Sequence, residues 1–308
     1  MNIAILGCGH IAHRIAKGIK FSNGTLYAVA SRDVKKAQAF ASLYNIPHAY
    51  TYEECMKDEQ VDLIYIATIN ATHYSLTEQC LLHHKHVICE KPFVENTKQL
   101  EELFDLAQKQ QCFLMEAHKT CFTPLNTEMK KRIHEIGEIQ HITAKYCRSF
   151  DLNGLSEANK EEKMGGCFYD VGVYPICFAN LFSDSKITTM HFNVKNHDSE
   201  LVDFEGKCQL IYQNGIVADL SCSWIYDEPS YGIITGSKGE IKILDYWKNN
   251  VGLIMNEEIN VEQKSDFTGE INHAIECIKK GLLESPVMSR KASLEIVKVL
   301  EEMKKQRY

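Results

Sequence analysis

The sequence predicts an α/β domain with a doubly wound parallel sheet over residues 1–118, followed by an α+β domain with a large, mostly antiparallel open sheet over residues 119–308. In the first part, short apolar runs alternate with amphipathic helical patterns, which is typical of a parallel sheet covered on both faces. A glycine-rich turn follows the first of these runs directly. In the second part, long segments of alternating polarity are typical of antiparallel strands with one buried face.

The elements of the first part follow from the spacing of their apolar residues. Runs of strand length alternate with stretches in which apolar residues recur every three or four positions. The connections between runs are long enough for the right-handed crossovers that parallel strands require. Asp33 and Asn96 precede two of the helical stretches and are suitable N-caps. We expect strands at 2–6, 25–30, 62–67, 86–89 and 112–115, and helices at 10–20, 33–43, 74–84 and 96–109.

The turn after the first strand has the pattern of a dinucleotide-binding site in a Rossmann domain. Gly7 is expected to make the tight turn, Gly9 to let a pyrophosphate approach the backbone, and Ala12 to pack the helix against the strand. His10 and Ile11, at the start of that helix, complete the predicted pyrophosphate site. Glycine-rich turns also connect strands to helices in folds that bind nothing, but the position between the first strand and the first helix favours binding.

The end of the second strand indicates which dinucleotide is bound. An acidic residue at this position normally binds the adenosine ribose of NAD, and here Ser31 and Arg32 stand instead. A hydroxyl and a guanidinium suit a 2′-phosphate, so we predict NADP as the cofactor, with NAD possible. The alternative is that Arg32 is a solvent-exposed side chain at a strand end.

Two further strands of the first part end in polar residues. Thr68, Asn70 and His73 follow the strand at 62–67, and Glu90 and Lys91, followed by a proline, end the strand at 86–89. The carboxyl ends of strands in an open parallel sheet form the ligand crevice, so we predict that these residues contact the cofactor. A surface ion pair is the alternative for Glu90 and Lys91.

The second part contains long strands joined by tight turns. Asn214-Gly215 and Lys238-Gly239 are hairpin sequences, because glycine accepts a positive φ. One helix is expected at the start of this part and two at its end. We expect strands at 138–148, 186–196, 201–213, 215–225, 230–236 and 239–245, and the final helices at 268–280 and 289–306.

The segment from Gly165 to Pro175 has the composition of a helix start with a functional face. Asp170 and Tyr174 are four residues apart, so they share one face of a helix. Pro175 is expected to bend the helix just past Tyr174. On an unrelated amphipathic helix, such residues would be a solvated acid and a packed aromatic.

Composition excludes several classes of function. The chain has 34 basic and 41 acidic residues, for a net charge of −7, and no basic stripe, so a nucleic-acid partner is not expected. No apolar stretch is long enough to span a membrane and no signal peptide is recognisable, so we expect a cytoplasmic protein that binds neither nucleic acid nor membrane.

Neither the cysteines nor the histidines indicate a disulfide framework or a metal site. The 12 cysteines are scattered singly, without a C-x-x-C pair, and are expected to be buried thiols. His83, His84 and His86 cluster at a helix–strand junction, where polar residues usually face solvent. No carboxylate or thiolate stands at a ligand spacing from them, so no metal is predicted.

Together these motifs resemble the Gfo/Idh/MocA family of oxidoreductases. The glycine turn, the polar ending from Asn70 to His73, the Glu-Lys-Pro sequence and the G-G-x-x-x-D-x-G-x-Y segment occur in the family's order. Leu-Met-Glu-Ala at 114–117 followed by Phe122-x-Pro124, and Ser285-Pro286, resemble the branch of dimeric dihydrodiol dehydrogenases and NADP-dependent xylose dehydrogenases. The chain departs from that branch at Cys121, where an arginine is frequent, and at His118, where an aromatic residue is common.

The resemblance implies hydride transfer between a nicotinamide cofactor and a hydroxyl or carbonyl group of a sugar, polyol or cyclic diol. Lys91, Tyr174 and Asp170 are then the expected catalytic residues. Tyr174 would exchange the proton, because the alkoxide formed by hydride transfer must be protonated, and the Lys91 ammonium would favour its phenolate. Asp170 would orient Lys91 or bind a substrate hydroxyl.

The resemblance also implies a homodimer or homotetramer formed through the C-terminal sheet, one face of which we expect to be too apolar to remain in water. Two other functions fit parts of the pattern. A sensor that binds NADP without turnover would need neither Lys91 nor Tyr174. A reductase of a non-sugar carbonyl or a tetrapyrrole would keep the same site with a different substrate pocket.

Overall fold

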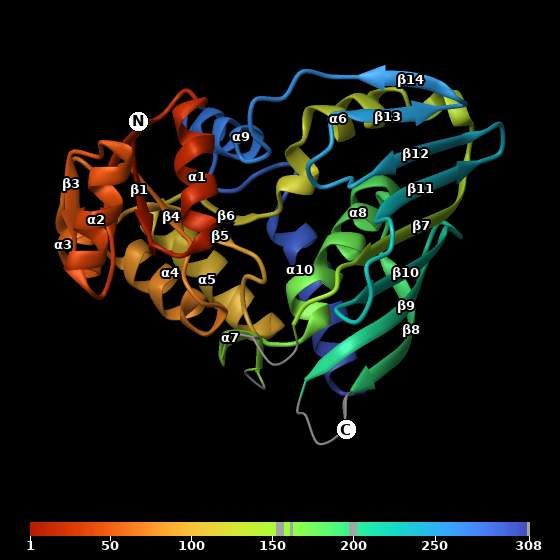
Figure 1. Cartoon of the computed structure of the whole chain (residues 1–308), viewed down its shortest axis with the longest axis horizontal. Helices are drawn as coiled ribbons and strands as arrows, with labels where there is room; N and C mark the ends of the chain where they lie inside the picture. Colours follow the sequence, from red (N-terminus) through yellow and green to blue (C-terminus); the bar gives the residue numbers. More distant parts are fainter. Residues whose placement is uncertain (152–156, 161–162, 197–201, 307–308) are drawn as a thin grey trace. The chain divides into compact units, whose positions relative to one another are not determined.

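The computed structural model describes residues 1–151, 157–160, 163–196 and 202–306 (Figure 1), and their packing divides the chain into two units. The first unit consists of Met1–Ala117 and Lys264–Ser293, and the second consists of His118–Gln263 and the chain from Leu294 onward. The sequence predicts that residues 264–293 belong to the second domain. These residues belong to the first unit because α9 (Thr268–Lys279) packs on α1 (His10–Lys20), where Gly18 leaves room for Phe267.

The first unit contains the predicted doubly wound parallel sheet. Its six strands lie in the order β3-β2-β1-β4-β5-β6, and every neighbouring pair is parallel. The strand β4 is buried along its whole length, and β1 and β5 are buried beyond their first residue, which explains their continuous apolar sequences. The strands are β1 (Asn2–Leu6), β2 (Thr25–Ala30), β3 (His48–Tyr50), β4 (Leu63–Ile66), β5 (His86–Glu90) and β6 (Leu114–Ala117).

The helices of the first unit agree with the predicted ones to within a few residues, and one strand–helix pair was missed. Asp33 and Asn96 are N-caps, as predicted, and accept hydrogen bonds from the backbone N–H groups of Lys35 and Gln99. The missed pair is β3 with α3 (Tyr52–Lys57), both too short for a periodic signal, although Thr51 begins a capping box. The other helices are α2 (Val34–Tyr44), η1 (Asn70–Thr72), α4 (His73–Leu82) and α5 (Thr97–Gln110).

The second unit contains an open sheet of eight strands in the order β14-β13-β12-β11-β7-β10-β9-β8. All neighbouring pairs are antiparallel except β7 with β10, so the sheet is mostly antiparallel, as predicted. The two strands nearest one edge, β13 and β14, were not predicted. The strands are β7 (Ile139–Cys147), β8 (Ile187–Asn196), β9 (Asp203–Tyr212), β10 (Val217–Ser223), β11 (Tyr231–Gly236), β12 (Glu240–Leu244), β13 (Val251–Ile254) and β14 (Glu257–Asn260).

The inner face of this sheet is covered by α8 (Val173–Ser183), which contacts β7, β10 and β11. Gly206 and Gly232 lie where a Cβ would clash with the rings of Phe168 and Phe178, so both glycines allow close packing of aromatic side chains on the sheet. The remaining helices of the unit are η2 (Lys119–Phe122), α6 (Pro124–Lys131), η3 (Ile133–Ile136), α7 (Glu157–Lys160) and a π-helix, η5 (Phe168–Gly172), and α10 (Arg290–Lys304) closes the chain.

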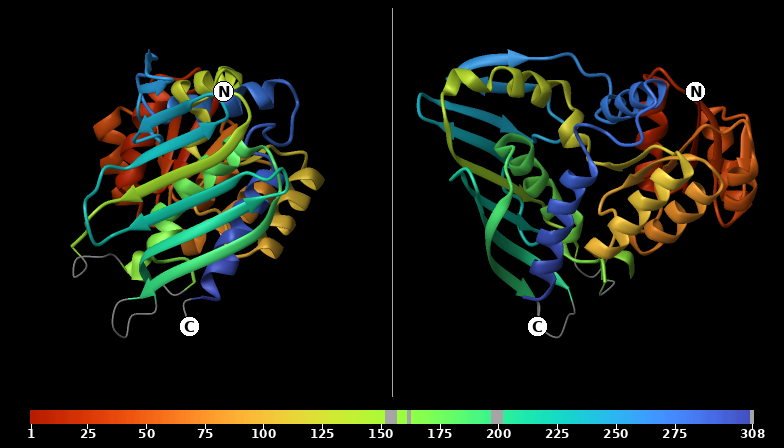
Figure 2. Two further views of the ribbon diagram at one scale, coloured as in Figure 1. Left: turned by 90° about the vertical axis from the view of Figure 1, so that its right-hand side faces the viewer. Right: turned by 180° about the vertical axis from the view of Figure 1, so that it is seen from behind.

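The outer face of the sheet, turned to the viewer on the left of Figure 2, is not the apolar surface that we predicted. The strand register places Gln209, Asp219, Thr143, Ile233 and Lys242 in one row across it. The buried row beside it is the apolar one and contains Cys208, Leu220, Ala144, Gly232 and Ile243. The alternation is real, but its apolar half faces α8.

The two predicted hairpin turns differ in backbone conformation. Gly215 has a φ of 87° and joins β9 to β10, as expected of a glycine selected for a positive φ. Gly239 joins β11 to β12 without a positive φ, and a Cβ there would lie 2.7 Å from Met255 Cγ. The second glycine therefore provides space rather than conformational freedom. Among the described helices, none is long and apolar enough to cross a membrane.

Candidate active site

The glycine turn has the geometry expected of a nucleotide-binding loop. Gly7 has a φ of 113°, and a Cβ there would lie 2.4 Å from the carbonyl oxygen of Ala67. Its backbone N–H donates to the carbonyl of Ala30 at 2.8 Å, which fixes the turn against β2. Only glycine adopts this positive φ without strain and leaves room for the Ala67 carbonyl.

The second glycine of the turn is not required by the protein's own packing. A Cβ on Gly9 would meet no atom within 4 Å, and its φ of −79° suits any residue. Gly9 is exposed and precedes the first turn of α1, formed by His10, Ile11 and the buried Ala12. An open backbone at a helix N-terminus fits the pyrophosphate of a dinucleotide, which a side chain on Gly9 would obstruct.

The residues at the end of β2 form a cationic group that the sequence revealed only in part. Ser31 is buried and Arg32 is exposed, and the Ser31 hydroxyl accepts a hydrogen bond from the backbone N–H of Asp33 at 3.3 Å. Burial raises the pKa of Cys8, whereas the hydrogen bond with Ser31 and the charge of Lys36 lower it. The charge of Lys36 therefore acts on this end of β2. We missed Lys36, although a lysine in the first turn of α2, directly after the strand end, could have indicated it.

His73 connects the ends of β4 and β5. Its ring is fully buried, with Nδ1 at 2.9 Å from the carbonyl oxygen of Pro92 and Nε2 at 3.2 Å from that of Thr68. Burial lowers the pKa of His73, which favours the neutral ring. A neutral imidazole donates from one nitrogen, and the shorter contact assigns that donor to the Pro92 carbonyl. Asn70, at the start of η1, lies between these two strand ends in sequence.

Glu90 ends β5 in a buried hydrogen-bond network. The Tyr65 hydroxyl lies 2.9 Å from Glu90 Oε1 and 2.6 Å from Glu270 Oε1. Burial and the two carboxyl groups raise the pKa of Tyr65 well above its usual value, so it remains a phenol. Lys91 follows Glu90 directly and is half-buried. We missed Tyr65 and Glu270, because one lies within an apolar run and the other is remote in sequence.

The second unit carries the other two predicted catalytic residues. Asp170 lies in the π-helix η5, and Tyr174 lies in the first turn of α8. The π-helix ends at Gly172, and the α-helix α8 then continues through Pro175 to Ser183. The irregularity of the helix therefore precedes Tyr174, whereas we predicted a bend just past it. Proline in the first turn of α8 is tolerated, because its missing N–H would have no partner within that helix.

Tyr174 belongs to an aromatic cluster that the sequence did not reveal. Its ring centroid lies 5.4 Å from that of Tyr146 and 5.8 Å from that of Trp247, and these two rings stack on each other at 3.9 Å. The Lys119 ammonium lies 6.0 Å from the Tyr174 ring centroid. Burial, followed by the charge of Asp170, raises the pKa of Tyr146 to about 12. Tyr146 thus contacts the ring of Tyr174 and is influenced by the charge of Asp170.

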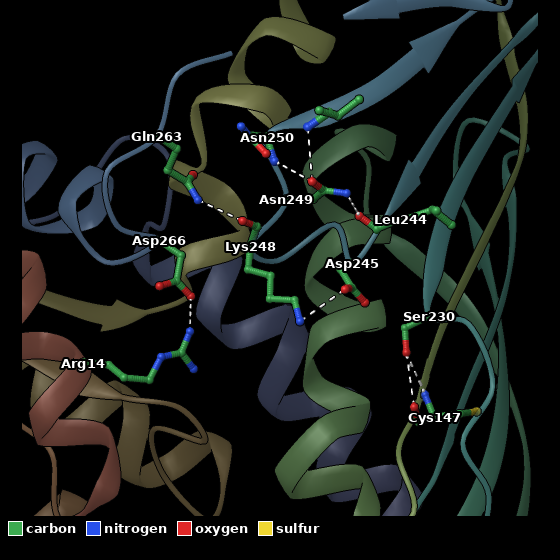
Figure 3. Close-up of polar contacts among 11 residues, drawn as sticks. Arg14, Cys147, Ser230, Leu244, Asp245, Lys248, Asn249, Asn250, Gln263 and Asp266 are labelled. Carbon is green, nitrogen blue, oxygen red and sulfur yellow. Dashed lines mark hydrogen bonds and ion pairs between the residues drawn. The ribbon is translucent and has the colours of Figure 1, made fainter. Parts of the chain in front are cut away.

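Polar contacts hold the turn that carries Trp247 (Figure 3). Lys248 Nζ lies 3.1 Å from Asp245 Oδ2, and the Asn249 side-chain amide donates to the Leu244 carbonyl at 2.9 Å. Gln263 Nε2 donates to the Lys248 carbonyl at 2.9 Å. These contacts join the residues on both sides of Trp247 to each other and to Gln263.

The positions at which the chain departs from its resemblance are also buried in the second unit. His118 and Lys119 are 1% and 4% exposed, and Cys121 Sγ lies 3.3 Å from Cys177 Sγ. In the described part of the chain, no three histidine, cysteine, aspartate or glutamate residues cluster so as to hold a metal ion. Within that part, all the cysteines are free thiols.

The predicted site residues thus fall into two groups. The glycine turn, Ser31, Arg32 and the residues at the ends of β4 and β5 lie in the first unit, whereas Asp170 and Tyr174 lie in the second.

Residues 1–118 match the model of an oxidoreductase family with an NAD-binding Rossmann fold, and residues 127–242 match the GFO/IDH/MocA C-terminal domain. A trans-1,2-dihydrobenzene-1,2-diol dehydrogenase from Xenopus laevis is 32% identical over 298 residues, which cover 89% of this chain and 87% of the relative.

This protein belongs to the Gfo/Idh/MocA oxidoreductase family. A second relative, the scyllo-inositol 2-dehydrogenase (NADP(+)) of Bacillus subtilis, is 32% identical and aligns over 99% of this chain and 97% of its own. The aldose-aldose oxidoreductase of Caulobacter crescentus, solved with glycerol, has the same fold with a TM-score of 0.89 at 21% identity, covering 100% of this chain and 97% of the other. A 3-ketoreductase from Actinomadura kijaniata, solved with NADP and TDP-benzene, has a TM-score of 0.86 at 22% identity, covering 99% and 97%.

Proposed function

We propose that this member of the family is an NADP-preferring dehydrogenase or reductase that acts on a hydroxyl or carbonyl group of a sugar, polyol or cyclic diol. The names of the two relatives that align over most of their length specify a dihydrobenzenediol and an inositol. Both compounds are six-membered carbocycles with adjacent hydroxyl groups. We therefore favour a cyclic vicinal diol, or the corresponding hydroxyketone, as the substrate.

The observation that carries the proposal is the position of Lys91 at the carboxyl edge of the NAD-binding sheet. Open parallel sheets bind ligands at this edge. The residue before Lys91 is held by Tyr65, and the carbonyl of the residue after it is held by His73. A cation in such a fixed position suits electrostatic stabilisation of charge that develops on a substrate oxygen.

The nicotinamide cofactor, when bound, accepts or supplies the hydride. Tyr174 is proposed to take up or release the proton of the substrate oxygen, with the Lys91 ammonium favouring its phenolate. Asp170 is proposed to orient Lys91 or to bind a second hydroxyl of the substrate. Thr68, Asn70, His73 and Glu90 are proposed to line the cofactor site.

The preference for NADP is supported by the residues at the end of β2. Ser31, Arg32 and Lys36 provide a hydroxyl and two cations, where an acidic residue would repel a 2′-phosphate. Gly9, His10 and Ile11 are proposed to bind the pyrophosphate. The relative from Bacillus subtilis carries NADP(+) in its name.

Kinetic assays with a substrate panel test the proposed function. Dihydrobenzenediol, scyllo-inositol, aldoses and open-chain polyols would each be assayed with NADP⁺ and with NAD⁺. We expect turnover of at least one cyclic diol and a higher kcat/KM with NADP⁺. Tight binding of NADPH without turnover of any alcohol or carbonyl compound would instead identify a sensor. Turnover of non-sugar carbonyls alone would identify the other type of reductase.

We also propose that the protein is a cytoplasmic homodimer or homotetramer, associated through the outer face of the C-terminal sheet. Buried free thiols support a reducing compartment. Ile211, Ile233 and Leu253 lie half-buried on the outer face between polar side chains, and interfaces that are not obligate have such mixed polarity. Analytical ultracentrifugation at micromolar concentration tests the association, and a species of 35.2 kDa alone would contradict it.

A further inference from the structure

We propose that Tyr65 and Glu270 are positioning residues for Lys91, acting through the buried carboxyl group of Glu90. This inference rests on the proposed function, because it concerns the lysine of the proposed reaction. Neither residue lies in a segment that the sequence identified as part of the site. All the residues involved belong to the first unit.

The network joins three elements at the residue before Lys91. Tyr65 lies on β4, Glu90 is the last residue of β5, and Glu270 lies in the first turn of α9. Tyr65 is fully buried, and Glu270 and Glu90 are 1% and 7% exposed. The hydroxyl of Tyr65 lies within hydrogen-bond distance of both carboxyl groups. Such short contacts in a dry environment fix the side chain of Glu90, and with it the backbone that leads into Lys91.

The number of protons in the network predicts which substitutions it tolerates. A phenol has a single hydrogen, so Tyr65 can donate to one carboxyl group only. The contact with the other carboxyl group is satisfied when that other group is protonated and donates its hydrogen to the phenol oxygen. Glutamine at position 270 supplies such a donor permanently through its amide, whereas leucine has a similar volume and supplies none.

A second anchor acts on the other side of Lys91. His73 holds the carbonyl oxygen of Pro92 at 2.9 Å and contacts that of Thr68 at 3.2 Å. The backbone is therefore tied one residue before Lys91 and one residue after it, which leaves the lysine itself between two fixed points. Loss of the Tyr65 anchor should free one side of the turn without unfolding it.

The opposite end of β5 provides a matched control. Lys85 precedes β5, is 7% exposed, and donates to the carbonyl oxygens of Asp58 at 2.6 Å and Val61 at 2.9 Å. Lys85→Met thus removes a buried polar anchor just before the same strand, at the end away from Lys91. The variant should be destabilised like Tyr65→Phe, without disturbing the turn.

The experiment compares Tyr65→Phe, Glu270→Leu, Glu270→Gln and Lys85→Met with the wild type, using hydrogen exchange of the peptide that spans Lys91, urea unfolding, NADPH binding and kcat. We expect Tyr65→Phe and Glu270→Leu to speed exchange at the turn by roughly tenfold or more and to lower kcat by about tenfold. The Kd of NADPH is measured beside kcat, because Glu90 is also proposed to line the cofactor site, and it should change by less than kcat does. Glu270→Gln should restore both exchange and kcat, and Lys85→Met should lower stability only.

Other outcomes would overturn the inference. Wild-type exchange at the turn in Tyr65→Phe would do so, even for a protein without measurable turnover. The same holds if Lys85→Met loses as much kcat as Tyr65→Phe at equal loss of stability, or if Glu270→Gln behaves like Glu270→Leu. Failure of the proposed function itself is separate, since it would appear as absent turnover in the wild type.

Discussion

The two units hold their candidate catalytic residues by different physical means. In the first unit, the residues around Lys91 are fixed by buried hydrogen bonds of Tyr65 with Glu90 and Glu270, and by the contact of His73 with the Pro92 carbonyl. In the second unit, the ring of Tyr174 packs beside those of Tyr146 and Trp247.

The difference reflects what each type of sheet offers. The carboxyl ends of parallel strands converge at one edge, where their polar residues can hydrogen-bond across neighbouring strands. An open antiparallel sheet instead offers a broad apolar face to a helix, and large rings fill the space between them. Polar anchors should respond to pH and to loss of a donor, whereas aromatic anchors should respond to loss of volume.

The largest expected effect is on the two proposed catalytic groups, one in each unit. Tyr174→Phe should lower kcat by about 10² to 10⁴-fold while NADP affinity stays near wild type, because general acid-base groups contribute that much. Lys91→Ala should do similar or greater damage. The two losses should not add in the double variant, because both groups are proposed to act on the same proton transfer.

Steady-state kinetics with an active substrate check this prediction. If the losses of kcat in the two single variants add fully in the double variant, Lys91 and Tyr174 act independently. Near wild-type kcat in Tyr174→Phe would mean that the phenol only packs, and would move the proton donor to His118 or a water molecule, because the His73 ring is buried against two backbone carbonyls.

Loss of volume in the aromatic cluster should be the next largest effect. Trp247 is 5% exposed, and its ring stacks on Tyr146 at 3.9 Å. Trp247→Ala should lower the free energy of unfolding by about 3–5 kcal/mol, as large-to-small substitutions in a core do. Trp247→Phe keeps a stacking ring and should lose less. Urea unfolding measures both, and equal losses would show that the stack itself contributes nothing.

A smaller effect is expected on cofactor choice. Arg32→Ala should weaken NADP binding by about tenfold or more and leave NAD binding nearly unchanged, because a charge-assisted phosphate contact is worth roughly 1.5–3 kcal/mol. Lys36→Ala should act in the same direction. Fluorescence titration with NADPH and NADH measures both affinities. An equal loss for the two cofactors would place Arg32 away from the 2′-phosphate.

The smallest effect concerns acid stability of the first unit. Burial lowers the pKa values of His73, His86 and His273 from the ordinary 6.5. Below pH 6.5 the unfolded state then binds more protons than the folded state. The contribution of these histidines to the free energy of unfolding should therefore be complete above pH 6.5 and should be lost as the pH falls below it. His86 Nδ1 accepts from the Phe113 N–H at 2.9 Å, a role that requires the unprotonated nitrogen.

His86→Gln keeps an acceptor without a titratable group and should flatten this pH dependence. His191→Gln, at an exposed position on β8, serves as the control. Urea unfolding between pH 5 and 8 measures the slope. A slope that is identical in the wild type and in His86→Gln would contradict the prediction.

Periodicity and turn residues in the sequence predicted most elements because those signals are local. The apolar run before Gly7 and the caps at Asp33 and Asn96 required no tertiary information. The short strand β3 and the edge strands β13 and β14 were missed, since a few residues carry no measurable period. The outer face was judged too apolar because alternation does not identify which half of the pattern faces the core.

The sequence by itself determined the family, the parallel sheet with its glycine turn, the open sheet, and the identities of Lys91, Asp170 and Tyr174 as candidates. These follow from local patterns and from motifs that are contiguous in the chain. Only the tertiary structure decided that α9 joins the first unit, that Tyr65 and Glu270 meet at Glu90, and that Trp247 and Tyr146 surround Tyr174. Each of these contacts joins residues far apart in sequence, and such pairs are specified by the packing of whole elements rather than by any pattern within one of them.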